Sequence, residues 1–155
     1  MNTSEEHFLG LLDDVLAMVR KHGLSDRHGQ RLFEAAMEGI GTWRVESITH
    51  EAARTLIESG FNTKLVCRAH RVSRLDTFIA LRDRVPRSKA FAFYLESDRT
   101  TLTTKTENGR HGVEHWSVVY PLPATLGELR ATFGVRFTKT QKAALAAAFA
   151  DVLRP

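Results

Sequence analysis

Apolar residues recur at helical spacing through the first part of the chain. Between Phe8 and Val19 they fall three or four residues apart, and a glycine then ends the run, which predicts an amphipathic helix. The same spacing predicts a second helix from about Ser25 and a shorter third helix from about Thr49. The amino-terminal third of the chain is therefore predicted to be helical.

The stretch from Lys64 to Pro86 fits two patterns. Residues 64–72 could alternate as a strand, but a helical projection gathers the basic positions within about 120° of one another, beside a mostly apolar face. These basic positions are Lys64, Arg68, Arg71, Arg74 and Arg82. We therefore favour a helix, a tight break near residues 72–73, and a second helix that Ser73 caps and that runs up to Pro86.

After Pro86 the apolar period changes from 3.6 to 2. Alternating residues, a turn after position 96, a threonine-rich run at 100–106 and the hairpin signal Asn108-Gly109 predict a three-stranded antiparallel meander. Two helices are predicted to close the chain, the second capped by Thr138 and Gln141.

These elements predict an α+β fold in one domain that spans residues 1–155. Its amino-terminal helices include a helix-turn-helix-like pair at about 49–85. The antiparallel strands lie at about 90–120, and the two carboxy-terminal helices lie at about 125–153.

The net charge of +4 is distributed unevenly. Residues 1–63 carry 6 Lys/Arg against 10 Asp/Glu, residues 64–89 carry 8 against 2, and residues 90–155 carry 8 against 6. A patch of this kind attracts a polyanion more than the mean charge suggests. The acidic amino terminus, the lack of a long apolar run and the single cysteine, Cys67, favour a cytoplasmic protein with no membrane segment.

Residues 66–81, VCRAHRVSRLDTFIAL, resemble a helix-turn-helix core. Val66 and Cys67 would open the first helix, and Arg71-Val72-Ser73 would form the turn. The longer stretch at about 53–84 resembles the corresponding region of TrfB-type plasmid repressors. This resemblance implies that the second helix of the pair enters the major groove of DNA.

On this hypothesis, Ser73 would bind a phosphate, and Arg74 and Thr77 would face base edges. Flanking cations would neutralise further phosphates. The predicted DNA-binding residues are Lys64, Arg68, Arg71, Ser73, Arg74, Thr77, Arg82, Arg84 and Arg87. The predicted hairpin would then be either a wing that carries Arg99, Lys105 and Arg110 or, as we favour, a sheet that only covers the helices.

No pattern in the sequence indicates catalysis or a cofactor. His111, Glu114 and His115 are close in sequence, but neighbouring strand residues point to opposite faces, so we expect no metal site. Neither a glycine-rich phosphate loop nor a GxSxG motif is present. We expect a protein that is not an enzyme.

The hypothesis that follows is a sequence-specific DNA-binding regulator of transcription, of a plasmid, phage or other mobile element. It would bind double-stranded DNA as a homodimer, so that two recognition helices meet two half-sites. The alternative is a protein-binding inhibitor, immunity or antiactivator module. Such a module would use an aromatic sheet face of Phe91, Phe93, Trp116 and Tyr120, and its basic segment would contact an acidic protein.

Overall fold

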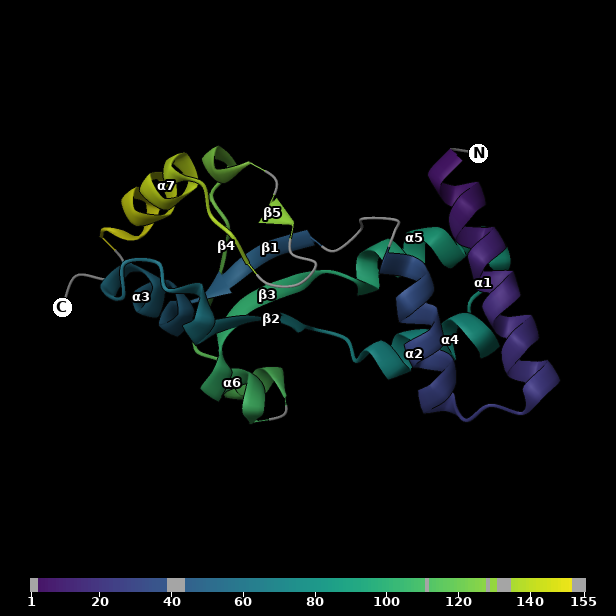
Figure 1. Cartoon of the computed structure of the whole chain (residues 1–155). Helices are drawn as coiled ribbons and strands as arrows, with labels where there is room; N and C mark the ends of the chain where they lie inside the picture. Colours follow the sequence, from purple (N-terminus) through teal and green to yellow (C-terminus); the bar gives the residue numbers. More distant parts are fainter. Residues whose placement is uncertain (1–2, 39–43, 111, 128, 131–134, 152–155) are drawn as a thin grey trace. The chain divides into compact units, whose positions relative to one another are not determined.

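The chain folds into two compact units, each built from two separate stretches of sequence. The computed structural model describes residues 3–38, 44–110, 112–127, 129–130 and 135–151. Unit 1 comprises Met1–Thr42 and Val72–Asp98, and unit 2 comprises Trp43–Arg71 and Arg99–Pro155 (Figure 1). The predicted α+β class is confirmed, whereas the division into two units was not predicted.

The described part of unit 1 consists of four helices around an apolar core. They are α1 (Thr3–His22), α2 (Asp26–Met37), α4 (Arg74–Asp83) and α5 (Arg87–Ser97). Helices α1 and α4 each contact both α2 and α5, so the four helices form a closed cycle. At the centre, the buried ring of Phe8 contacts those of Phe33, Phe91 and Tyr94.

Helix α5 replaces the first strand of the predicted meander. The alternation of Phe91 with Phe93 suggested a strand, but Ala90 and Tyr94 lie four residues apart and are both buried, as on one face of a helix. Phe91 and Tyr94 both reach the ring of Phe8, more than 80 residues away in sequence. Tertiary packing therefore overrides the local period of two.

Two glycines of unit 1 provide a matched pair for testing its packing. A Cβ atom added at Gly29, on α2, would lie 2.7 Å from the ring of Phe78 and 3.0 Å from Val19 Cγ2, whereas one at Gly10, on α1, would meet no atom within 4 Å. We expect Gly29→Ala to destabilise the protein by about 1–3 kcal/mol through overpacking. Gly10→Ala should stabilise it by up to about 1 kcal/mol. Urea unfolding of both variants measures the difference, and equal effects of one sign would contradict this packing.

Unit 2 is a mixed sheet with helices against one face. The strands are β1 (Arg44–Thr49), β2 (Val66–His70), β3 (Thr100–Thr104), β4 (Val119–Pro121) and β5 (Leu129–Arg130). Four of them follow the order β2-β3-β1-β4, and β5 pairs with the start of β1. Strands β1 and β3 are parallel, and the other pairs are antiparallel.

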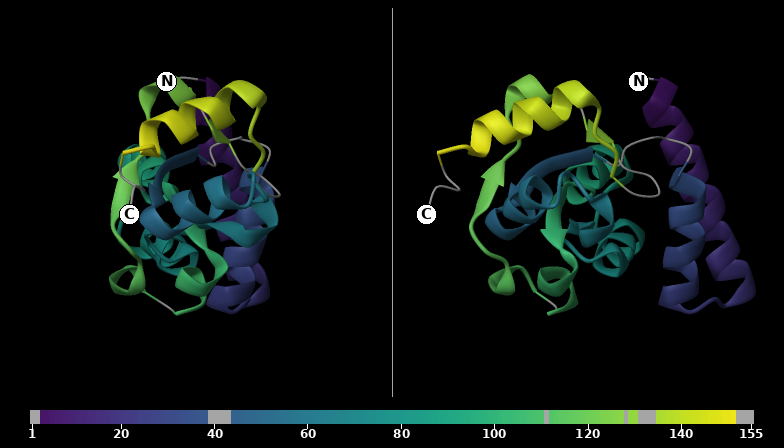
Figure 2. Two further views of the ribbon diagram at one scale, coloured as in Figure 1. Left: turned by 90° about the vertical axis from the view of Figure 1, so that its left-hand side faces the viewer. Right: turned by 60° about the vertical axis from the view of Figure 1, so that its left-hand side comes forward.

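The apolar core of unit 2 lies between the sheet and two helices, α3 (His50–Glu58) and α7 (Lys139–Phe149). These helices contact each other and appear as neighbours in both views of Figure 2. Ile48 and Leu102 come from the sheet, Leu56 from α3, and Leu145 and Phe149 from α7. Thr49 caps α3, and Thr138 with Gln141 forms the predicted capping box of α7.

The structure corrects several other predictions for unit 2. Residues 66–70 form strand β2 and not a helix, because all five pair with β3, some 30 residues further along the chain. A short helix, α6 (Lys105–Gly109), stands where a hairpin turn was predicted, so the three-stranded meander is wrong. The first predicted carboxy-terminal helix is only a 3-10 turn, η4 (Ala124–Leu126), followed by β5. Residues 128, 131–134 and 152–153 of those predicted helices lie outside the described residues.

Candidate functional site

The predicted DNA-binding residues are divided between the two units. Lys64, Arg68 and Arg71 belong to unit 2, and the other six belong to unit 1. Lys64 lies on the 3-10 turn η2 (Thr63–Leu65), and Arg68 is half-buried on β2. Because the first helix of the predicted pair is a strand, the helix-turn-helix geometry is wrong for this segment.

The start of α4 is correctly predicted, but its polar side chains are engaged within the helix. Ser73 caps α4 and accepts a hydrogen bond from the Asp76 amide at 3.4 Å. Thr77 is buried, and its hydroxyl donates to the Ser73 carbonyl at 3.2 Å. Thr77 is therefore not placed to face base edges.

Three predicted arginines of unit 1 form ion pairs with carboxylates. Arg74 contacts Glu34 at 2.9 Å, and Arg87 contacts Asp13 at 2.6 Å. Arg82 pairs with Asp83 at 2.7 Å and also with Asp26. Hydrogen bonds to these two carboxylates raise the pKa of Arg82, and the hydrogen bond from Arg82 lowers the pKa of Asp83. Arg84, at the end of α4, is exposed and has no ion pair among the described residues.

The excess positive charge of the protein resides in unit 2. Its two stretches contain 13 Lys/Arg against 7 Asp/Glu, a net charge of +6. Unit 1 contains 9 Lys/Arg against 11 Asp/Glu, a net charge of −2, although it holds most of the basic stretch at 64–89. A polyanion is therefore attracted to unit 2.

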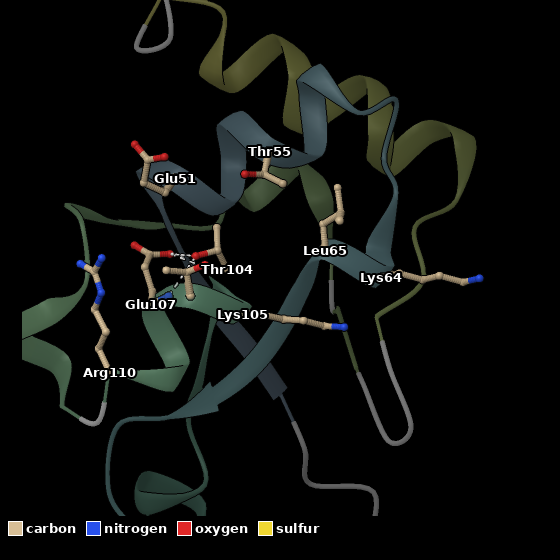
Figure 3. A pocket seen from close by; sticks show the side chains of 9 residues that line it. Glu51, Thr55, Lys64, Leu65, Thr104, Lys105, Glu107 and Arg110 are labelled. Carbon is tan, nitrogen blue, oxygen red and sulfur yellow. Dashed lines mark hydrogen bonds between the residues drawn. The ribbon is translucent and has the colours of Figure 1, made fainter.

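An open pocket of about 560 Å³ lies on unit 2, and three cations line it. We call it the basic pocket; its lining residues are Glu51, Thr55, Lys64, Leu65, Thr104, Lys105, Thr106, Glu107 and Arg110. In Figure 3, Lys64 and Lys105 extend toward one side, and Arg110 stands on the other, with Thr104 and Glu107 between them.

The three cations of the basic pocket are exposed and have no carboxylate partner among the residues that the structure describes. Each occupies a defined backbone position. Asn62 caps the turn of Lys64, and Lys105 and Arg110 stand at the two ends of α6. The pocket therefore presents unneutralised positive charge, which suits an anionic ligand.

Neither carboxylate of the basic pocket neutralises these cations directly. Glu51 pairs with Arg54. Glu107 is 6% exposed and accepts five hydrogen bonds. To Oε2 the donors are Thr49 Oγ1, Thr104 N and Thr104 Oγ1, at 2.8, 2.9 and 3.1 Å, and to Oε1 they are Ser117 N and Oγ, at 2.8 and 2.6 Å.

Glu107 is charged in the folded protein. Burial alone would raise its pKa, but the hydrogen bonds from Ser117, Thr104 and Thr49 outweigh this effect and lower the pKa below its ordinary value of 4.5. The carboxylate joins the end of β1, the start of α6 and residue 117. It thereby holds the backbone that carries Lys105 and Arg110.

Sequence reasoning missed Lys105 and Arg110 as parts of one pocket with Lys64. The hairpin interpretation of Asn108-Gly109 concealed the capping box that Thr104 and Glu107 form at the start of α6. A threonine followed three residues later by a glutamate could have revealed this helix, and with it the position of Lys105.

The aromatic sheet face of the alternative hypothesis is absent from the described structure. Phe91 and Phe93 lie on α5 of unit 1, and Trp116 and Tyr120 belong to unit 2. Tyr120 is half-buried, and its ring packs against those of His50 and Phe149.

No protein-family model matches the chain, and no curated protein or solved structure shows significant similarity to it. The resemblance to TrfB-type repressors therefore rests on the quoted residues alone. Within the described residues, no three His, Cys, Asp or Glu side chains are grouped so that they could hold a metal ion. None of the described helices has the length and apolar character that a membrane span needs.

Proposed function

We propose that this protein binds double-stranded DNA, and that the contact surface is on unit 2, around the basic pocket. Lys64, Lys105 and Arg110 would contact backbone phosphates. The observation that carries the proposal is a contrast in charge pairing. These three cations have no carboxylate partner among the described residues, whereas Arg74, Arg82 and Arg87 of unit 1 are ion-paired.

The chemistry of the pocket favours phosphate groups over neutral ligands. Lysine and arginine side chains supply most of the sequence-independent affinity of proteins for DNA, because each neutralised phosphate releases counterions. The pocket is open and its cations are exposed, so they can reach an extended backbone without first breaking an ion pair. The net charge of +6 on unit 2 would also speed the encounter.

The proposal predicts salt-dependent binding that charge reversal in the pocket abolishes. With three phosphates neutralised, the dissociation constant for a random-sequence duplex should rise about 40-fold between about 50 mM and 200 mM salt. The double variant Lys64→Glu/Lys105→Glu should weaken binding at the lower salt concentration by at least about tenfold. Fluorescence anisotropy of a labelled duplex measures both effects.

A matched double variant in unit 1 provides the control. Arg84 and Lys89 are exposed and belong to the basic stretch on which the sequence hypothesis rested. Arg84→Glu/Lys89→Glu changes the net charge by the same amount, and we expect it to weaken binding no more than about twofold to threefold. A larger loss in this variant than in the pocket variant would place the interface on unit 1. Absence of saturable binding by the wild type at low salt would refute DNA binding altogether.

Regulation of transcription and assembly as a homodimer remain part of this proposal. Two copies would double the number of phosphate contacts and would read two half-sites of one operator. Sedimentation of the protein with and without duplex decides the stoichiometry. A one-to-one complex at saturation would contradict the homodimer.

A further inference from the structure

The two faces of the unit 2 sheet differ in chemistry. One face carries the apolar core, with Ile48 and Leu102. The opposite face carries small polar side chains, which we call the hydroxyl face: Ser47, Thr49, Cys67, Thr101 and Thr103. The four hydroxyl residues of this face are buried. Because burying hydroxyl groups gains little hydrophobic stabilisation, such a face is better suited to holding polar groups than to packing.

Arg71 reaches across the hydroxyl face from the end of β2. Strand pairing places Ala69, Thr101 and Ser47 in one row across three strands. Arg71 is two residues beyond Ala69. Its Nε–H donates to Thr101 Oγ1 at 3.2 Å, and its Nη2 donates to Ser47 Oγ at 2.7 Å. The small side chain of Ala69 leaves this path open.

The hydrogen-bond inventory of this row has donors in excess. A guanidinium has five N–H groups, of which two donate to the hydroxyls and three remain. Ser47 Oγ and Thr101 Oγ1 lie 2.7 Å apart, so one hydroxyl donates a hydrogen bond to the other. The hydrogen of the second hydroxyl is then still available for a further acceptor. Arg71 is an exposed residue, and no carboxylate among the described residues pairs with it.

We propose that Arg71, oriented by Ser47 and Thr101, is a binding site for one phosphate group, distinct from the basic pocket. The two hydroxyls fix the guanidinium through neutral acceptors, so its positive charge stays available and its planar fork is already oriented. Its free N–H groups match the oxygens of a tetrahedral oxyanion. The phosphate belongs either to a nucleic-acid backbone or to a free phosphate ester.

An NMR titration with inorganic phosphate at constant ionic strength tests the site. The wild type should bind saturably with a dissociation constant on the order of 1 mM, and the largest shifts should fall on Ser47, Arg71 and Thr101. Arg71→Gln should weaken binding by at least about tenfold. Arg71→Lys keeps the charge but loses the fork, and it should also weaken binding about tenfold.

The unit 1 variant Arg84→Glu/Lys89→Glu is the matched control, and its affinity for inorganic phosphate should stay within about threefold of the wild type. Thermal unfolding of each variant separates loss of binding from loss of folding. A wild type that does not saturate by about 20 mM phosphate overturns the site. It is also overturned if Arg71→Gln lowers only the melting temperature and leaves phosphate binding unchanged.

Two further arms identify the source of the phosphate. If Arg71→Gln lowers the salt dependence of duplex binding by about one phosphate, the ligand is the DNA backbone. If Arg71→Gln leaves duplex binding unchanged but loses binding of a nucleoside 5′-monophosphate, the ligand is a free ester. Failure of DNA binding in the wild type would refute the proposed function and not this site, which the phosphate titration tests by itself.

Discussion

Replacing Glu107 by glutamine should lower the free energy of unfolding by about 3–5 kcal/mol. The side chain keeps its size, but the charge that five donors share is lost. The new amide nitrogen must also face groups that themselves donate. Because both tryptophans belong to unit 2, urea unfolding followed by tryptophan fluorescence reports on the unit that contains Glu107. The Glu58→Gln control lies at an exposed position on α3 and should change stability by no more than about 0.5 kcal/mol.

The contribution of Glu107 should also depend on pH in a defined direction. The folded-state pKa lies below the ordinary value of 4.5, so the charged side chain stabilises the folded state above about pH 4.5. This stabilisation is lost as the pH falls through the folded-state pKa. The difference in unfolding free energy between the wild type and Glu107→Gln should therefore be constant near neutral pH and should shrink in acid. A difference that stays constant to about pH 2 would show that Glu107 is not the charged centre described here.

The second large effect is expected at Phe8, in the core of unit 1. Phe8→Ala should cost about 3–5 kcal/mol, because the fully buried ring leaves a cavity. The ring is 4.9 Å from that of Tyr94 at an interplanar angle of 25°, and 5.3 Å from that of Phe91. Truncation removes both ring contacts as well. Far-UV circular dichroism during urea unfolding is the appropriate measurement, since the described part of unit 1 consists of helices.

Phe8→Leu serves as the matched variant for this core. Leucine retains most of the buried apolar volume, so the cost should stay below about 1.5 kcal/mol. Equal losses for leucine and alanine would mean that the aromatic contacts, and not the filled volume, dominate. A loss below about 1 kcal/mol for alanine would contradict the burial of Phe8.

Local sequence patterns correctly predicted the helices whose capping residues and apolar spacing lie within the segment itself. Helices α1, α2, α3 and α4 and the capping box of α7 were all expected, because their signals lie within a few residues of each element. The type of two other elements was predicted wrongly: β2 was expected to be a helix, and α5 was expected to be a strand. Both segments fit two periods, and distant partners decided between them: β3 for the segment at 66–70, and Phe8 for Phe91 and Tyr94.

The candidate site was harder to predict than the helices, because charge pairing is not local. The sequence placed Arg74, Arg82 and Arg87 in one basic stretch, but their partners Glu34, Asp26 and Asp13 are 40 or more residues away. Conversely, Lys64 and Lys105 line the same pocket only because β2 and β3 are neighbours in the sheet. The uneven charge of the basic stretch was correctly recognised, but the sequence could not show that Arg74, Arg82 and Arg87 are ion-paired, whereas Lys64 has no carboxylate partner among the described residues.

The interleaving of the two units has a consequence for synthesis on the ribosome. Strand β1 ends at Thr49, but β3, which joins it to β2, starts only at Thr100. At about 5–20 residues per second, the nascent strand waits roughly 3–10 s for its parallel neighbour. During that interval the edges of β1 and β2 are open to other chains. A chaperone that holds extended segments would therefore be expected to act mainly before residue 104 has emerged, after which the edge of β1 that pairs with β4 and β5 stays open.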